Sequence, residues 1–342
     1  MKQNLNLAVF LVSSLFCSSL FSQDLHFTQY EFAPIHVNPA NTGGFFGTFR
    51  LSGIYRDQGA SIGSAGSLYR TPLFGMDVNF GFAFRAKDWT SLAISFFQDR
   101  TGEINLGKGG FLASGAYHLG IGKGDLAIGA QFGGVNLNAK NPEKANFLDE
   151  LDSGASSSPD DSKLQSGKAN YQDISGGLVF TTPISVKKHL LKVGLSSAHI
   201  TQPSFSLSGG TGSYKLKMLW SAHGSLEYHL NEKVDLTPMF WLRNLDKFNE
   251  TVAQCMASYL FNVEKKVRLN AGLGYRFGDA LQIMAGMNYG KIKAQIGYDK
   301  TVSGLTKAQD PSGFGAIELG IMYTGNITKK PNPKPKVFCP RF

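Results

Sequence analysis

The stretch VRLNAGLGYRF, from Val267 to Phe277, decides the fold because apolar and polar residues alternate along its whole length. A side-chain period of two is that of a β-strand, in which successive residues point to opposite faces of the sheet. Two more alternating runs follow, at 281–290 and 292–300, with no helical pattern between them. The apolar face ends in aromatic residues and the polar face carries full charges. This combination favours a transmembrane β-barrel. The strands of a soluble β-sandwich show the same alternation, so a sandwich remains an alternative at this point.

The composition of the 342 residues agrees with many short strands. Charged residues make up only 17%, which is low for a soluble protein, while a mean hydropathy of −0.12 is too polar for a helical membrane protein. Weakly alternating strands reconcile the two values. The net charge of +9 favours acidic partners, such as the phosphates of outer-membrane lipid or an acidic protein surface. Nucleic acid is not an expected partner, because no basic run with interleaved aromatic residues occurs.

The first 22 residues have the pattern of a secretory signal peptide. Lys2 supplies the positive charge, residues 7–21 form the apolar region, and Ser22 precedes the expected cleavage ahead of Gln23. Beyond this point no run of 18 or more apolar residues predicts a transmembrane helix. The chain is therefore expected to be exported, either as a soluble protein or as a barrel.

Alternation and turn residues together predict fourteen strands. They are expected at 45–57, 76–86, 89–98, 108–120, 124–136, 173–182, 189–199, 217–230, 233–244, 251–263, 266–277, 281–290, 292–300 and 314–324. The connections alternate between long and short, as in outer-membrane barrels, whose long loops lie outside the cell and whose short turns lie in the periplasm. A sandwich has no reason to sort its connections this way. The prediction is an all-β outer-membrane barrel of about fourteen antiparallel strands over 45–324, with both ends of the barrel in the periplasm.

Two flanking segments do not fit as strands. Residues 23–44, rich in aromatic and turn residues, are expected either to enter the lumen as a plug or to lie across the periplasmic mouth. Residues 325–342 contain a run of lysines and prolines and are expected to form a short, extended periplasmic tail. The connection 138–170 has an acidic centre, for which a solvated loop is a simpler interpretation than a calcium site.

Charged side chains on the polar strand faces are expected to point into the lumen. They are Arg268, Arg276, Lys293 and Asp299. We expect them to form an ionic ladder that fills the interior, with an anion-selecting ring as the alternative. The spacing of the histidines matches no metal motif, and no cofactor is expected. His199, near the outer end of a strand, is the histidine best placed for a special role, although a structural hydrogen bond is the simpler expectation.

The beginning of the mature chain resembles a known family. The motif QDLHFTQY at 23–30, followed by NPANTG at 38–43, is similar to the opening of the PorP/SprF family of type IX secretion membrane proteins from Bacteroidetes. Further similar stretches follow in order, among them YRDQ at 55–58, GYD at 297–299 and the ending CPRF at 339–342. Gly59 is a departure, because the family often has a tryptophan after its Y-R-x-Q.

The resemblance implies an outer-membrane barrel that serves type IX secretion and gliding motility. Members resemble partners of surface adhesins with a type B C-terminal signal, which they help to export or anchor at the cell surface. Others resemble barrels linked to a periplasmic peptidoglycan-binding protein. The alternative is an outer-membrane diffusion channel, a porin. An enzyme is not expected, because no Ser-His-acid group can be placed on the outer wall.

Partner contacts are expected at both ends of the barrel. Outside the cell, the connections 137–172 and 200–216 are candidates for seating a cargo domain. On the periplasmic side the candidates are Gln29, Tyr30, Asn38 and Pro39 in the N-terminal segment and Cys339, Pro340, Arg341 and Phe342 in the tail. The competing expectation is that the N-terminal segment only plugs the barrel.

Overall fold

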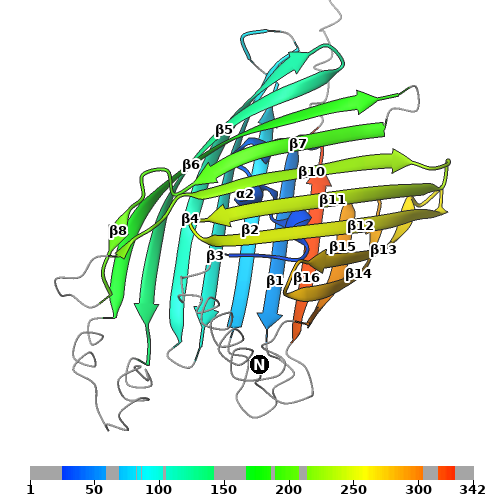
Figure 1. The fold of residues 1–342 in the computed structure, drawn as a ribbon. Helices are drawn as coiled ribbons and strands as arrows, with labels where there is room; N and C mark the ends of the chain where they lie inside the picture. The colour runs from blue at the N-terminus through cyan, green and yellow to red at the C-terminus, as the bar shows by residue number, and fades with distance from the viewer. Residues whose placement is uncertain are drawn as a thin grey trace, which may run out of the picture.

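Fourteen strands close into one antiparallel barrel in the computed structural model of the chain (Figure 1). The structure describes residues 25–58, 69–81, 83–85, 87–102, 105–141, 167–185, 189–207, 214–302 and 315–327. Within these ranges no helix is long and apolar enough to cross a membrane. The predicted all-β barrel of about fourteen strands is confirmed.

Each barrel strand pairs with its neighbours along the chain, and the first pairs with the last to close the barrel. In order they are β1 (Phe49–Gln58), β2 (Tyr69–Phe80), β3 (Trp89–Thr101), β4 (Leu106–Ile121), β5 (Gly124–Ala139), β6 (Lys168–Ile184), β7 (His189–Ala198), β10 (Leu219–His229), β11 (Val234–Leu245), β12 (Phe248–Asn262), β13 (Val267–Arg276), β14 (Ala280–Tyr289), β15 (Ile292–Thr301) and β16 (Gly315–Gly325). Two short strands, β8 (Ser204–Phe205) and β9 (Tyr214–Lys215), pair with each other between β7 and β10.

The two ends of the barrel differ in their connections. The longest ones leave from one end, which we call the outer end, and they are 59–68, 140–167, 199–218 and 302–314. The opposite, inner end carries mostly short turns, such as 122–123 and 290–291, and there β1 begins and β16 ends. In outer-membrane barrels the long loops face the outside of the cell and the short turns face the periplasm, so the inner end is the periplasmic one.

One strand lies elsewhere than predicted. β2 spans Tyr69–Phe80, whereas the alternating pattern predicts a strand at 76–86. Pro72 argues against a strand because proline lacks the backbone N–H that a ladder uses. In the structure Pro72 pairs with Tyr55 of β1, and the register between β2 and β3 has no pair at 71 or 72. This gap in the ladder accommodates the missing donor, and the strand begins earlier than the pattern suggests.

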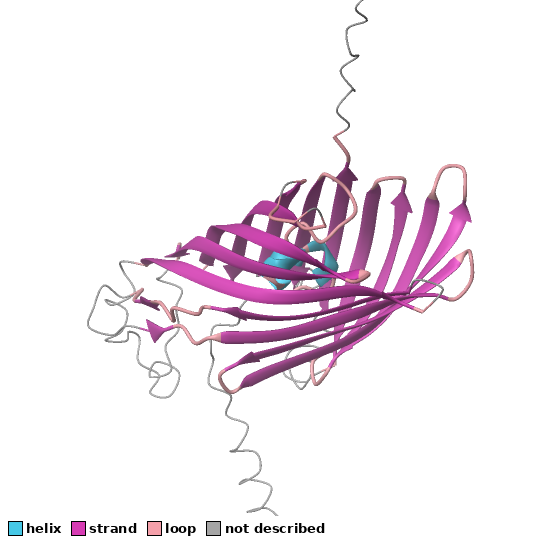
Figure 2. Ribbon diagram, turned by 90° about the horizontal axis from the view of Figure 1, so that it is seen from above, coloured by secondary structure: helices cyan, strands magenta, loops and turns pink. Residues whose placement is uncertain are grey.

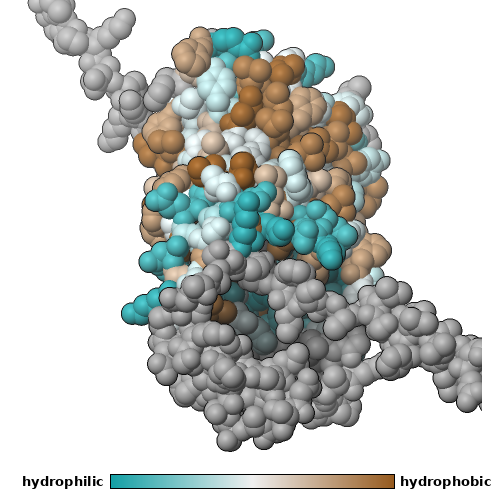
Figure 3. Space-filling view, turned by 60° about the vertical axis from the view of Figure 1, so that its left-hand side comes forward, coloured by the Kyte–Doolittle hydropathy of each residue, from teal (hydrophilic) through white to brown (hydrophobic). Residues whose placement is uncertain are grey.

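The barrel has an apolar outer surface and a polar inner surface. Leu273 and Ile283 point outward and are 62% and 50% exposed, whereas the inward-pointing Asn270 and Gln282 are 5% and 0% exposed. Figure 3 shows hydrophobic residues gathered over the strands, with a patch of hydrophilic residues nearer the grey segments. An apolar outer wall around a polar interior is the inverse of a soluble protein and is what a lipid bilayer requires.

The lumen is filled by the N-terminal segment, residues 25–48. It contains three single helical turns, η1 (Tyr30–Phe32), α2 (Pro34–Val37) and η2 (Pro39–Asn41). Figure 2, which views the barrel from above, shows the helical turns enclosed by the strands. This is the plug alternative of the two positions expected for the segment.

The N-terminal segment runs through the lumen from the outer end to the inner end. Leu25, the first described residue, packs in one apolar cluster with Leu137 and Ala169, at the outer ends of β5 and β6. The carbonyl of Thr42 lies 2.8 Å from Nε2 of His118, near the inner end of β4. The segment then joins β1 at the inner mouth.

The turn between β2 and β3 at the inner end carries a small ionic network. Asp88 accepts hydrogen bonds from the Arg85 guanidinium at 2.9 Å, the Tyr117 hydroxyl at 2.6 Å and the backbone N–H of Gly120 at 3.0 Å. The hydrogen bond from Arg85 is the main reason why the pKa of Asp88 lies well below its ordinary value. The network links two neighbouring turns at the inner rim.

Candidate functional site

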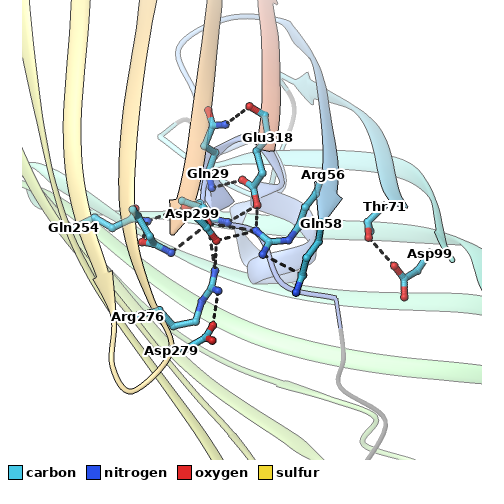
Figure 4. Close-up of polar contacts among 12 residues, drawn as sticks. Gln29, Arg56, Gln58, Thr71, Asp99, Gln254, Arg276, Asp279, Asp299 and Glu318 are labelled. Carbon is cyan, nitrogen blue, oxygen red and sulfur yellow. Dashed lines mark hydrogen bonds and ion pairs between the residues drawn. The ribbon is translucent and has the colours of Figure 1, made fainter. Parts of the chain in front are cut away.

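The central polar site is a buried ionic cluster on the inner wall. Arg56 of β1 lies 2.5 Å from Glu318 of β16 and 3.0 Å from Asp299 of β15, measured between side-chain nitrogen and oxygen atoms. Arg276 of β13 pairs with the same Asp299 at 3.1 Å. All four side chains are nearly inaccessible to solvent. Strand alternation places each on the inner face, and closure of the barrel between β1 and β16 brings them together (Figure 4).

The N-terminal segment completes this cluster from inside the lumen. The backbone N–H groups of Thr28 and Gln29 each donate to a Glu318 carboxylate oxygen at 2.8 Å. The Thr28 hydroxyl donates to Asp299 at 2.5 Å, and the Gln254 side chain donates to the Thr28 carbonyl at 2.8 Å. The two carboxylates are thus satisfied by two arginines and by the plug. A buried charge pair is tolerated when its remaining hydrogen bonds are made, and here the plug makes them.

A second contact anchors the plug at its NPA turn. The Asn38 side chain donates to the carbonyls of Leu178 and Leu195, each at 3.1 Å, while its own oxygen accepts from the N–H of Ala40 at 2.9 Å. The wall provides room through glycine: a Cβ at Gly177 would lie 2.1 Å from the Asn38 Oδ1. A Cβ at the neighbouring Gly176 meets nothing closer than 3.6 Å.

Other inner-wall glycines also fit the plug closely. A Cβ added at Gly129 would lie 2.3 Å from the backbone nitrogen of Ala40, and one at Gly320 would lie 2.7 Å from the Phe32 ring. Real Cβ atoms do not approach other heavy atoms so closely, so either side chain requires a shift of the plug or of the wall. The wall and the plug are therefore shaped to each other along the lumen.

The ends of the plug are also held by charge. Arg50 of β1 and Asp77 of β2 form a buried pair at 2.6 Å, and Asp77 also accepts from the backbone N–H of Gly43 at 2.8 Å. Lys293 lies 2.6 Å from the carboxylate of Glu31. These contacts lie on different strands, so the plug is fixed to several parts of the barrel wall.

The four residues predicted to face the lumen all lie on the inner wall. Arg276 and Asp299 meet in the ionic cluster, Lys293 reaches the plug, and Arg268 contacts Asp235. The structure therefore joins two of them directly and leaves the other two in separate pairs. Each of the four charges has an opposite charge beside it.

The predicted partner-contact residues of the N-terminal segment lie buried in the lumen. Gln29, Tyr30, Asn38 and Pro39 are enclosed by the wall rather than presented at the periplasmic mouth. Tyr30 packs on Trp241 with ring centroids 5.0 Å apart. The other four, Cys339, Pro340, Arg341 and Phe342, lie outside the described residues, as do 142–166 of the acidic connection and the signal-peptide region. A partner role for these residues stays a prediction.

The central pair of the ionic cluster was not predicted from the sequence. Arg56 and Glu318 stand in stretches that resemble the family, but nothing in the sequence says that they meet. One signal was present: a charged residue at an inward position of an alternating strand needs a partner of opposite charge. Counting such positions on the first and last strands would have identified this pair.

Three potential metal ligands meet at the inner end, although histidine spacing did not predict it. Glu227 and His229 of β10 and Asp235 of β11 each place one ligand atom within 4.8 Å of the others. His229 Nδ1 lies 2.7 Å from one Asp235 oxygen, and Arg268 contacts the other. Because Arg268 already neutralises Asp235, we interpret the cluster as an ionic network of the wall.

Two solved structures of similar shape are monoaromatic hydrocarbon channels. The TodX monoaromatic hydrocarbon channel, as a deltaS2 mutant, aligns with a TM-score of 0.51 at 10% identity over 86% of this chain and 94% of that one. The CymD monoaromatic hydrocarbon channel aligns with the same TM-score and identity over 90% and 95%. At this identity the likeness shows the fold alone. No curated protein matches the chain in sequence.

The family is shown by a sequence model rather than by these structures. The model of the type IX secretion system membrane protein PorP/SprF matches residues 19–320. This range includes the N-terminal motifs that form the plug and every barrel strand except the last five residues of β16. Together with the outer-membrane barrel fold it places the protein in the outer membrane. The chain belongs to the PorP/SprF family of type IX secretion system membrane proteins.

Proposed function

We propose that this barrel binds an exported surface adhesin with a type B C-terminal signal, and that it helps to export the adhesin or anchors it at the cell surface. We also propose that a periplasmic peptidoglycan-binding protein contacts its inner end. Both roles are binding roles and require no catalysis. Family membership supports a place in the secretion and gliding machinery, and the finer assignment rests on the closed lumen.

The observation that carries this proposal is the packed plug. A diffusion channel needs a continuous water-filled path, whereas here the plug runs from Leu25 at the outer end to Thr42 near the inner end. Its centre is fixed by the buried cluster of Arg56, Asp299 and Glu318. A barrel closed in this way suits a protein that holds a partner better than one that passes solutes.

The outer end supplies the candidate surface for the adhesin. The β8–β9 hairpin stands at this end beside β6, and Phe205 stacks on Tyr171 with ring centroids 5.4 Å apart. Because this contact fixes the hairpin to the barrel, a partner bound to the hairpin would also be held in a fixed position on the barrel. For the periplasmic partner, the candidate contact is the inner turn 230–233.

The first test is purification of the tagged barrel from its native envelope in mild detergent, after crosslinking, with mass spectrometry of the copurifying proteins. We expect a large exported adhesin and a peptidoglycan-binding protein. Replacing residues 204–215 by a short Gly-Ser linker should remove the adhesin alone, and replacing the turn 230–233 should remove the periplasmic partner alone. A barrel recovered without either partner would contradict the proposal.

Conductance in planar bilayers separates the anchor from the porin alternative. The wild-type barrel is expected to show little steady ion current, because its lumen is closed by the plug. Deleting residues 25–43 should open a current if the barrel folds without the plug. A steady wild-type current as large as that of the deletion variant would support the diffusion channel instead.

A further inference from the structure

Basic side chains gather on the outer surface of the wall, near the outer ends of strands β2 to β6. They belong to one row of cross-strand partners, which we call the basic row and which consists of Asp57, Arg70, Arg100, Gly107, Asn138 and Lys168. Each of the strands β1 to β6 contributes one residue. The row therefore crosses the wall at a single level.

Alternation along the strands directs these side chains outward. Arg70 has the same phase as the exposed Phe74 on β2, and Arg100 has the same phase as the exposed Phe96 on β3. Asp99, next to Arg100 in the chain, has the opposite phase and points into the lumen. Its carboxylate therefore lies on the other side of the wall from the two guanidinium groups.

The basic row carries more positive than negative charge. Asp57 lies 3.5 Å from Nε of Arg70, whereas Arg100 and Lys168 have no carboxylate partner among the described residues. Arg70 and Arg100 lie directly opposite each other, and like charges in that position destabilise a sheet. An anion between them would remove the repulsion and give both guanidinium groups an acceptor. The row is therefore suited to bind a phosphate.

The wall beside the basic row suits acyl chains. Phe74, Phe96 and Phe111 are cross-strand partners on β2, β3 and β4, four residues closer to the middle of the barrel, and they are 49%, 51% and 41% exposed. Four residues of a strand span roughly 13 Å, so the rings lie within the hydrocarbon when the basic row lies among the lipid headgroups. A charge on the lipid-facing wall is costly near the midplane and tolerated at the interface. The basic row therefore lies at the level of the headgroups of the outer leaflet.

The side chains also leave room for a headgroup. At this level β4 has glycine at two successive outward positions, Gly107 and Gly109. No side chain therefore stands between Arg100 of β3 and the amides of Asn136 and Asn138 on β5. A guanidinium can bind a phosphate through two parallel hydrogen bonds, and a carboxamide can both donate to and accept from a sugar hydroxyl.

We propose that the basic row and the phenylalanines beside it bind a phosphorylated glycolipid of the outer leaflet, of the lipid A class. Its phosphate lies between Arg70 and Arg100, its sugars lie over the glycines of β4, and its acyl chains cover the phenylalanine rings. Arg100 and Lys168 are three strand spacings apart, roughly 14 Å, which suits a disaccharide headgroup better than a single phosphate. This site is on the outside of the wall and is independent of the adhesin and of the periplasmic partner.

The basic row is confined to one side of the barrel. Near the outer ends of β11 to β16, within the described residues, Lys300 is the one basic side chain at an outward position. A general attraction between the barrel and anionic lipid does not require such a concentration of charge. The asymmetry favours one bound lipid at a defined place.

The test titrates the full mature protein, in a non-ionic detergent, with purified lipid A and counts the bound lipid by native mass spectrometry. We expect the wild type to retain one lipid A per barrel. The double variant Arg70→Gln with Arg100→Gln should weaken this binding at least tenfold, and so should removal of the phosphates from lipid A. Gly109→Leu adds a side chain where a Cβ meets nothing closer than 3.5 Å, so it should weaken binding without a change of charge.

Lys247→Gln is the matched control. It removes an exposed charge at the same end of the barrel, in the turn between β11 and β12 on the opposite side, so the variant should bind lipid A as the wild type does. Heat-modifiable mobility on gels checks that each variant keeps its barrel, and Gly109→Leu serves where the double variant fails to fold. Equal retention of phosphatidylglycerol and lipid A by the wild type would overturn the glycolipid class. Retention of lipid A that the double variant leaves unchanged, or retention of neither lipid, would overturn the site.

Discussion

Replacing Glu318 by alanine tests whether the ionic cluster holds the plug. Glu318 accepts the backbone N–H groups of Thr28 and Gln29 at 2.8 Å and pairs with Arg56 at 2.5 Å. The alanine leaves both amides without their acceptor and removes one of the two carboxylates facing the arginine. The strand ladders of β16 with β1 and β15 use backbone groups and stay unchanged. The substitution should therefore reduce the stability of the docked plug and leave the strand pairing intact.

The free energy lost in Glu318→Ala can be estimated from the groups that lose their partners. Each buried N–H without an acceptor costs about 1–3 kcal/mol. Breaking a buried ion pair costs about 3–5 kcal/mol, and the lower end applies because Arg56 keeps Asp299 at 3.0 Å. The two losses share the same local relaxation, so they do not add in full. We expect about 4 kcal/mol for Glu318→Ala, which raises the population of the undocked plug by roughly a thousandfold.

Two assays measure this loss. In one, urea unfolding of the barrel in lipid vesicles gives the change in stability; in the other, planar-bilayer recording detects openings when the plug leaves. Glu264→Ala, at an exposed glutamate in an inner turn, is the matched control and should change neither. The double variant Arg56→Met with Glu318→Met should lose less than the two single changes combined, because it leaves neither charge uncompensated.

One result would contradict the role of Glu318 in holding the plug. If Glu318→Ala unfolds within about 1 kcal/mol of the wild type and its conductance stays closed, then neither the amides nor the arginine depends on the carboxylate. The cluster would then be solvated or redundant. The plug would be held mainly by its packing against the glycines of the wall.

Three further outcomes are expected. Leu273→Arg, on the outer face of β13, should cost roughly 2–4 kcal/mol in urea unfolding in lipid; a cost below about 1 kcal/mol would contradict a lipid-facing wall. Gly177→Ala should destabilise the barrel by about 1–3 kcal/mol and expose the plug to protease, whereas Gly176→Ala should do neither. Asp88 has a depressed pKa, so its stabilising effect is present above its ordinary value of 3.8 and is lost as the pH falls toward its folded-state pKa. The thermal midpoints of wild type and Asp88→Asn should therefore differ at pH 7, and the gap between them should narrow as the pH falls below 3.8; a gap at pH 2 as large as that at pH 7 would contradict the assignment.

The barrel could be predicted because its signal is local. Alternation within each strand and the sorting of long and short connections need no knowledge of distant contacts, and they gave fourteen strands in order. β2 was misplaced because Pro72 breaks the local pattern, and a gap in the neighbouring ladder cannot be read from one strand. The inward direction of the charged residues also followed from alternation alone.

The site could not be predicted in the same way because its contacts are remote in sequence. Thr28 meets Glu318 across 290 positions, and this meeting depends on closure of the barrel and on the plug lying inside it. Period and composition give the face on which a residue lies, but not its height in the lumen or its partner. The contact between Asp173 and His199 could not be predicted either, because it depends on the pairing of the neighbouring strands β6 and β7.

The direction of the plug links the two proposed binding ends. Its tether to β1 lies at the inner end, while Leu25 packs among residues of the outer end, so the same segment reaches both ends of the barrel. The contacts between these parts, at Glu318 and at Asn38, are buried and well satisfied. One end of a segment held in this way cannot move without distorting the contacts at its centre. Occupation of one mouth is therefore expected to change the stability of the plug at the other, and Glu318→Ala should weaken that coupling because it loosens the centre.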